Sequence, residues 1–377
     1  MITSGQTLTA AADHRKHRYG RVACRPSWKS GSNVSVKGVL ANTLLLATSL
    51  LVTLAAAELW LRYGMSPERL IPNAPETPTL NERRNALRFY GKQRERAKMG
   101  GHDRWLGWDA GDDVTRVRGR RTIPPTKEGE LRVIALGDSF TWGNEVGAQE
   151  NFAHLLDAAD NGLQVLNMGV PGFGIDQMVL KYERHGAALE PDLIVLGIYV
   201  SDYERSTVGF TAAAKPLFHL LGGELKLSNS PVPSPAAALE QIARSLDGRL
   251  YLEEFIESRL PDARQPAAAF FDASDLLIEG LLRRLVGALA DEQHLLVLHI
   301  PRGESFVRPD AFHQEMSARL LALYRRLGLR TVDAGEVLAA GNLRAEVPGH
   351  FYRVRESGSI GHLNPAGHQA IADAVAD

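Results

Sequence analysis

The residues best suited to chemistry are a serine and a histidine that lie in separate parts of the chain. The apolar run 131–136 ends in Gly137-Asp138-Ser139, and the residues that follow can form a helix. A serine on such a strand-to-helix turn lies where the helix dipole favours negative charge on an attacking oxygen. The motif alone is weak, because Asp138 or Ser139 could simply cap the helix. Ser139 is therefore a candidate nucleophile that still needs a base.

A candidate base lies near the C-terminus, where Gly361-His362 leads into Asn364-Pro365 and a final helix. His362 falls on the loop before that helix, at the edge of the fold where Ser139 is expected to emerge. The alternative is a surface histidine without a catalytic role. His368 lies within the helix and is expected to be structural.

The sequence predicts no metal site and no other cofactor. Neither histidine belongs to a His-Glu-x-x-His pattern, which is typical of zinc enzymes. The one cysteine, Cys24, lies in the basic N-terminal stretch, so the rest of the chain can form no disulfide and no thiolate site.

Short apolar runs predict the elements that must position the two residues. Five runs are expected to be strands: 131–136, 163–168, 193–198, 294–300 and 329–332. Stretches with helical character, such as 152–159 and 275–290, separate most of them. Strands that are apolar on both faces and alternate with helices are typical of a parallel sheet covered on each side. We therefore predict a three-layer α/β/α sandwich over residues 131–377.

One connection in this pattern is too long for a single helix. It lies between the third and fourth predicted strands, and its segment 208–270 contains clusters of Pro, Gly and Ser. Open α/β folds bind ligands at the carboxyl edge of the sheet. We expect the segment to form a cap-like insertion over that edge.

The N-terminal part of the chain predicts a membrane anchor. Residues 1–37 are basic, and 38–57 carry no charge. Such a stretch is long enough to cross a bilayer, and the charge asymmetry places the N-terminus in the cytoplasm. We predict a transmembrane signal-anchor at 38–63, a juxtamembrane linker and lead-in at 64–130, and a catalytic domain that is periplasmic or extracellular. Cleavage after Ala57 and a buried soluble helix are the alternatives.

Overall composition limits the remaining function classes. The chain has 377 residues, of which 44% are hydrophobic and 23% charged, which is enough for one main domain and an appendage. The net charge is −1, so no nucleic-acid partner is expected. The sequence does not indicate an oligomeric state.

Through the motifs around Ser139 and His362, the chain resembles the SGNH/GDSL hydrolase family, particularly its membrane-anchored envelope members. Four blocks match in order, within about residues 100–377: 137–140, 167–174, 197–202 and the segment around His362. The resemblance implies a flavodoxin-like sandwich in which Ser139 attacks an ester carbonyl. It also implies that the main-chain N–H groups of Ser139 and Gly169 face the oxyanion.

Two positions depart from the family pattern. Ser201 stands before Asp202 where the family has an asparagine that donates to the oxyanion, and Ser359 stands where the family has an aspartate three residues before the histidine. Losing one oxyanion donor costs about 10²- to 10³-fold in rate. A Ser-His dyad is therefore the working mechanism, in which Glu356 or a main-chain carbonyl could replace the missing acceptor and Asp138 is a supporting residue.

The predicted function is hydrolysis of acyl esters, such as acetyl esters, on an envelope glycan or lipid. Two alternatives remain open. An acyltransferase to a cell-envelope polysaccharide would use the same acyl-enzyme with a different acceptor. A catalytically impaired binding module would hold an acylated polymer in the same cleft, and the two serine substitutions favour it.

Overall fold

A computed structural model describes residues 35–65, 87, 101–159, 161–211, 213–259, 267–290 and 293–377. Most of the predicted basic segment 1–37 lies outside the described residues, as does most of the predicted linker before residue 101. Ala55–Asp377 forms one compact unit, which contains every residue of the candidate site.

The centre of this unit is the predicted five-stranded parallel sheet. Its strands are β3 (Leu131–Gly137), β4 (Leu163–Asn167), β5 (Leu193–Tyr199), β8 (His294–Ile300) and β9 (Arg330–Asp333). They lie in the order β4-β3-β5-β8-β9, and every neighbouring pair is parallel. The prediction of a parallel α/β sandwich is therefore confirmed, with strand bounds within two residues of the predicted ones.

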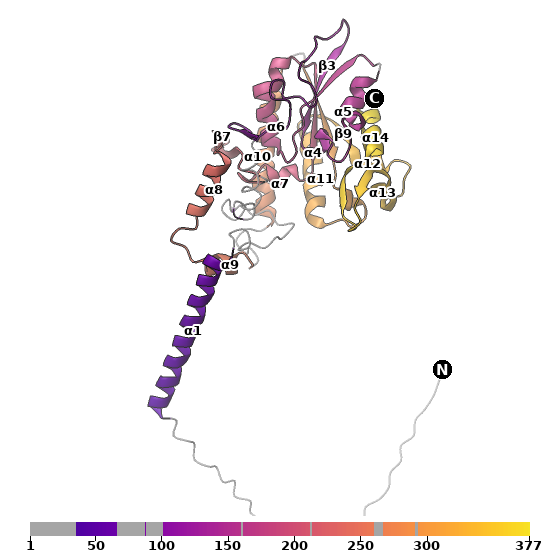
Figure 1. Cartoon of the computed structure of the whole chain (residues 1–377). Helices are drawn as coiled ribbons and strands as arrows, with labels where there is room; N and C mark the ends of the chain where they lie inside the picture. The colour runs from indigo at the N-terminus through magenta and orange to yellow at the C-terminus, as the bar shows by residue number, and fades with distance from the viewer. Residues whose placement is uncertain are drawn as a thin grey trace, which may run out of the picture. The chain divides into compact units, whose positions relative to one another are not determined.

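Helices cover both faces of the sheet because successive strand residues point to opposite sides. Ile134 and Leu136 of β3 belong to one apolar core, and Val133 and Ala135 belong to another. The first core includes α6 (Ile175–Lys181), α10 (Ala267–Gly287) and α11 (Ala311–Arg326). The second includes α5 (Phe152–Ala158), α12 (Ala334–Ala339) and α14 (Pro365–Ala376). Figure 1 shows these two helical layers on either side of the strands.

Short elements follow the carboxyl ends of the strands and carry the site. They are α4 (Ser139–Trp142) after β3, α7 (Asp202–Arg205) after β5, α13 (Val347–Phe351), and the antiparallel pair β10 (Tyr352–Val354) and β11 (Ile360–Leu363) before α14. Parallel strands end at a common edge. Segments that are distant in sequence therefore meet there.

The described part of the lead-in belongs to the folded unit. Its two short strands, β1 (His102–Asp103) and β2 (Gly107–Trp108), pair antiparallel. Leu106, Trp108 and Val117 are buried in the first core. Residues 101–117 therefore pack as part of the α/β domain.

The described part of the insertion between α7 and α10 contains a hairpin and two helices. The elements are β6 (Leu217–Leu221), β7 (Glu224–Ser228), α8 (Pro235–Arg244) and α9 (Tyr251–Glu257). Its base is fixed by buried Lys215, which pairs with buried Asp176. At its other end, the Glu58 carboxylate accepts the main-chain N–H groups of Tyr251 and Leu252 at 3.1 and 2.8 Å. That the insertion caps the carboxyl edge remains a prediction.

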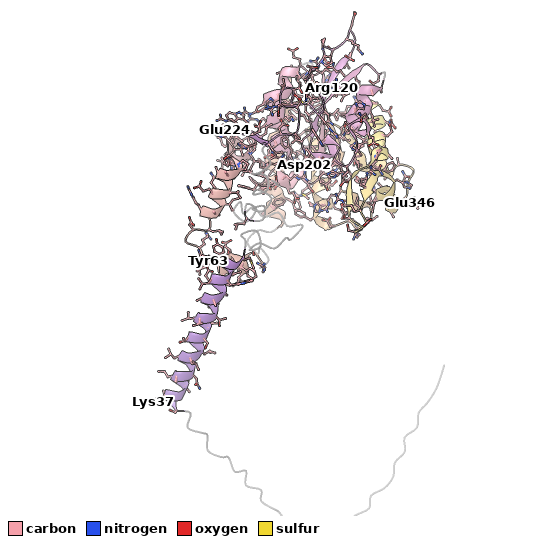
Figure 2. All side chains as sticks on the ribbon, viewed as in Figure 1. Lys37, Tyr63, Arg120, Asp202, Glu224 and Glu346 are labelled. Atoms are coloured by element: carbon pink, nitrogen blue, oxygen red, sulfur yellow. The ribbon has the colours of Figure 1, made fainter. Side chains whose placement is uncertain are left out.

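The N-terminal helix, α1, runs over Val36–Gly64, and its residues from Ala55 onward belong to this unit. Figure 2 labels Lys37 and Tyr63 near its two ends. At 1.5 Å per residue, its 29 residues measure about 44 Å, which exceeds the hydrocarbon thickness of a bilayer. Among the described residues, α1 is the one helix that is long and apolar enough to span a membrane.

Candidate active site

Ser139 and His362 meet at the carboxyl edge of the sheet. Ser139 is the first residue of α4, directly after β3, and His362 lies in β11. The His362 Nε2 atom lies 2.8 Å from the Ser139 hydroxyl oxygen, which is hydrogen-bonding distance. The serine is 6% exposed. The two residues singled out from the sequence thus form the contact that proton transfer from serine to imidazole requires.

The surroundings of His362 favour the neutral ring. Burial lowers its pKa, and although Asp138 and Glu145 act in the opposite direction, the net pKa stays below the ordinary value. The ring lies 4.8 Å from the ring of Phe140, which in turn stacks on Tyr199 at 4.4 Å. A neutral imidazole can accept the serine proton at neutral pH.

Asp138 and Asp202 support the site through a shared arginine. Both carboxylates are fully buried, and each lies 2.7 Å from the Arg205 guanidinium group. Asp138 also accepts the Phe140 N–H at 2.8 Å, and Asp202 accepts the Tyr199 N–H at 2.9 Å. Asp202 is labelled in Figure 2. The network joins the turn after β3 to the turn after β5, and Arg205 is a member that sequence reasoning missed.

Burial and charge pairing shift the pKa values of Asp202 and Arg205. It raises the pKa of Asp202 well above the usual range, and the nearby Asp138 carboxylate raises it further. The pKa of Arg205 is raised despite burial, because both carboxylates stabilise its charge. The guanidinium group therefore keeps its charge between two buried acids.

The predicted oxyanion donors differ in their availability. The Ser201 side chain makes no hydrogen bond to any described residue, so its hydroxyl is free to donate. The Gly169 N–H is engaged, because it donates to the Asn167 side-chain oxygen at 3.0 Å. Gly172 is in the left-handed region (φ 84°), and its N–H has no partner among the described residues. This loop lies beside the nucleophile, since Arg205 contacts both Asp138 and the Phe173 carbonyl.

Ser359 and Glu356, the supporting residues expected near His362, form no hydrogen bond with its second ring nitrogen, Nδ1. Ser359 precedes β11, and in an extended strand three residues span about 10 Å. Its hydroxyl lies 2.9 Å from that of Ser357. Glu356 is exposed in the turn between β10 and β11. Neither forms a hydrogen bond with His362 in the part of the chain that the structure describes.

A different carboxylate approaches His362. Oε2 of Glu145 accepts the main-chain N–H of His362 at 3.0 Å and lies 3.7 Å from its Nδ1 atom. Glu145 follows α4 by three residues, and no motif in the sequence singled it out. The one local sign was its place in a turn just after the candidate nucleophile.

Comparisons with known proteins give one family match and several similar solved structures. Residues 135–370 match the GDSL-like lipase/acylhydrolase family. Among solved structures, a G-D-S-L family lipolytic protein from Veillonella parvula is similar, with 13% identity and a TM-score of 0.36, covering 65% of this chain and 96% of that one. An acetylxylan esterase from Geobacillus stearothermophilus also has 13% identity, with a TM-score of 0.37 and coverage of 66% and 93%. A search of curated proteins gave no match.

The family match spans well over half of the chain and includes Ser139 and His362. The strand order and the contact between these residues fit that match. The protein is thus a hydrolase acting on ester bonds, and the chain belongs to the GDSL-like lipase/acylhydrolase family.

Proposed function

We propose that the protein cleaves acyl esters with Ser139 as nucleophile and His362 as general base. The observation that carries the proposal is the 2.8 Å contact between the Ser139 oxygen and Nε2 of His362. The hydroxyl proton passes to Nε2 while the oxygen bonds to the carbonyl carbon. The same proton then passes to the departing alcohol oxygen, which leaves an acyl-enzyme. Water completes the cycle by the reverse sequence, with His362 removing its proton.

The negative oxygen of the tetrahedral intermediate needs fixed donors. We propose the main-chain N–H groups of Ser139 and Gly172 together with the Ser201 hydroxyl. None of these three groups donates a hydrogen bond to another described residue. Gly169 keeps a supporting role, because its N–H bonds to Asn167 and fixes the loop after β4.

The proposed substrate is an acyl ester, such as an acetyl ester, on a glycan or lipid of the cell envelope. This part of the proposal depends on α1, whose length and lack of charge suit a membrane anchor. The basic residues before it would keep the N-terminus in the cytoplasm and the catalytic unit outside.

The test uses the full-length chain in detergent with a short-chain aryl ester and a fluorophosphonate probe. We expect acid release and covalent labelling, and loss of both in Ser139→Ala. The matched control is Ser357→Ala, which removes the hydroxyl of an exposed serine in the β10–β11 turn. Failure of the wild-type protein to label would refute the proposal and favour a binding module.

Transfer to a sugar hydroxyl uses the same acyl-enzyme. Product analysis with an acylated donor and a glycan acceptor separates the two outcomes. Free acid as the sole product identifies a hydrolase, and an acylated glycan identifies a transferase.

A further inference from the structure

We propose that Glu145 is the acid that orients His362 and stabilises its charged form, so that the site works as a Ser139–His362–Glu145 triad. The inference rests on the proposed function and extends it to a positioning residue outside the family pattern. It replaces the dyad expected from the sequence with a triad whose acid, Glu145, lies in the turn after α4, the helix that begins with Ser139.

The first step in the argument is the state of the imidazole ring. If Ser139 donates its proton to Nε2, the neutral ring carries its own hydrogen on Nδ1. That atom is buried and has no hydrogen-bond partner within the described residues. A buried N–H without an acceptor is costly. The ring therefore requires an acceptor on the side away from the serine.

Glu145 is positioned to supply that acceptor. Its Oε2 atom lies 3.7 Å from Nδ1, which is too long for a hydrogen bond but close enough for attraction between opposite charges. A movement of about 1 Å would bring the pair to bonding distance, and catalytic contacts often tighten when substrate binds. The imidazolium that forms during attack would strengthen this contact.

The carboxylate is also held from both sides. Oε2 accepts the main-chain N–H of His362 at 3.0 Å, so the acid is tied to the residue that it orients. Oε1 pairs with Arg355, which lies in the β10–β11 hairpin together with His362. A Cβ atom on Gly361 would lie 2.4 Å from Oε2, so only glycine leaves room for this approach.

The backbone of Glu145 is a further sign of a specialised role. Its φ is 68°, in the left-handed region where a residue with a Cβ atom is strained. The same turn contains Gly143, which is also in the left-handed region (φ 82°), and Arg118 donates to the Trp142 carbonyl at its start. Such strain is concentrated at functional sites. Glycine would relieve it but would carry no carboxylate.

No other acid serves the ring as well. Asp138 is engaged by Arg205 and by the Phe140 N–H, and it lies next to the nucleophile. Of the charged groups that act on His362, Asp138 and Glu145 raise its pKa, whereas Arg205 and Arg355 lower it. Glu145 is the carboxylate within 4 Å of Nδ1 in the described part of the chain.

The test compares Glu145→Gln with Glu150→Gln in the full-length protein. Both changes replace a carboxylate with an isosteric amide, and Glu150, in the 3-10 helix Ala148–Glu150, accepts the Gly147 N–H and does not contact the histidine. We expect Glu145→Gln to lower kcat by about 10²- to 10³-fold. The loss should be smaller than for a well-aligned triad, because the acid stands 3.7 Å away. Glu150→Gln should behave as wild type.

The pH profile separates this role from a structural one. Removing the Glu145 charge lowers the pKa of His362, so the acid limb of kcat/KM should move to lower pH. A merely structural residue would leave that limb in place. A melting scan of each variant shows whether it is folded, and the rate of fluorophosphonate labelling should fall in parallel with kcat.

The outcomes distinguish this inference from the proposed function. Absence of fluorophosphonate labelling in the wild-type protein would refute both the proposed function and the triad. If the wild-type protein is labelled but folded Glu145→Gln has an unchanged kcat and an unchanged acid limb, the triad alone is refuted. A loss in Glu356→Gln with normal activity in Glu145→Gln would assign the acid to Glu356 and overturn the inference.

Discussion

Replacement of Arg205 by methionine should cost more stability than any surface ion pair in the protein. Arg205 is one-quarter exposed and bridges Asp138 and Asp202, whose side chains are fully buried. Methionine fills similar space but leaves two neighbouring buried carboxylates without their cation. Breaking a buried pair by removing one partner costs about 3 to 5 kcal/mol. Because the guanidinium group is partly exposed, we expect about 3 kcal/mol at pH 7.5.

The pH dependence of this loss has a definite sign. Arg205 lowers the pKa of Asp202, so without the guanidinium group this folded-state pKa rises further above its usual range. A raised folded-state pKa stabilises the protein at low pH and is lost as pH rises. Each pH unit is worth about 1.4 kcal/mol for one extra bound proton. The variant should therefore regain part of its lost stability relative to wild type between pH 7.5 and pH 5.

Thermal or urea unfolding of the full-length protein in detergent measures this effect. At pH 7.5 we expect the melting temperature to fall by roughly 6 °C, with a smaller difference at pH 5. Arg355→Met is the control, because its pair with Glu145 is half exposed and worth about 1 kcal/mol or less. A loss in Arg205→Met no larger than in the control, or equal at both pH values, would refute the reasoning.

Two further predictions concern the histidine and its acid. Gly361→Ala places a Cβ atom 2.4 Å from Oε2 of Glu145, so the carboxylate must move; activity on an aryl ester should fall at least about 10-fold, and a fully active variant would contradict the close fit. Burial lowers the pKa of His362, so the midpoint of the acid limb of wild-type kcat/KM should lie below pH 6.5. An acid limb centred above pH 6.5 would show that the ring is more easily protonated than its burial implies.

The sequence was sufficient to predict the layers of the fold. Within the apolar runs 131–136 and 294–300, residues 133–136 and 296–300 are buried on both faces, and a sheet covered by two helical layers provides that environment. It also identified Ser139 and His362, because each lies on a short segment joined to an apolar strand or to a terminal helix. In the lead-in, sequence periodicity was too weak to show that Leu106 and Trp108 belong to the core.

The sequence by itself singled out the proposed nucleophile and base and determined the sheet that brings them to one edge, since local patterns of polarity and turn residues encode these features. The tertiary structure alone decided which groups surround them. Glu145 reaches His362, and Arg205 joins Asp138 to Asp202. Such contacts depend on side-chain reach across turns that are not neighbours in sequence. The family's spacing, with an acid three residues before the histidine, leads to Ser359 and could not reveal Glu145. The extended backbone of β11 carries Ser359 away from the ring.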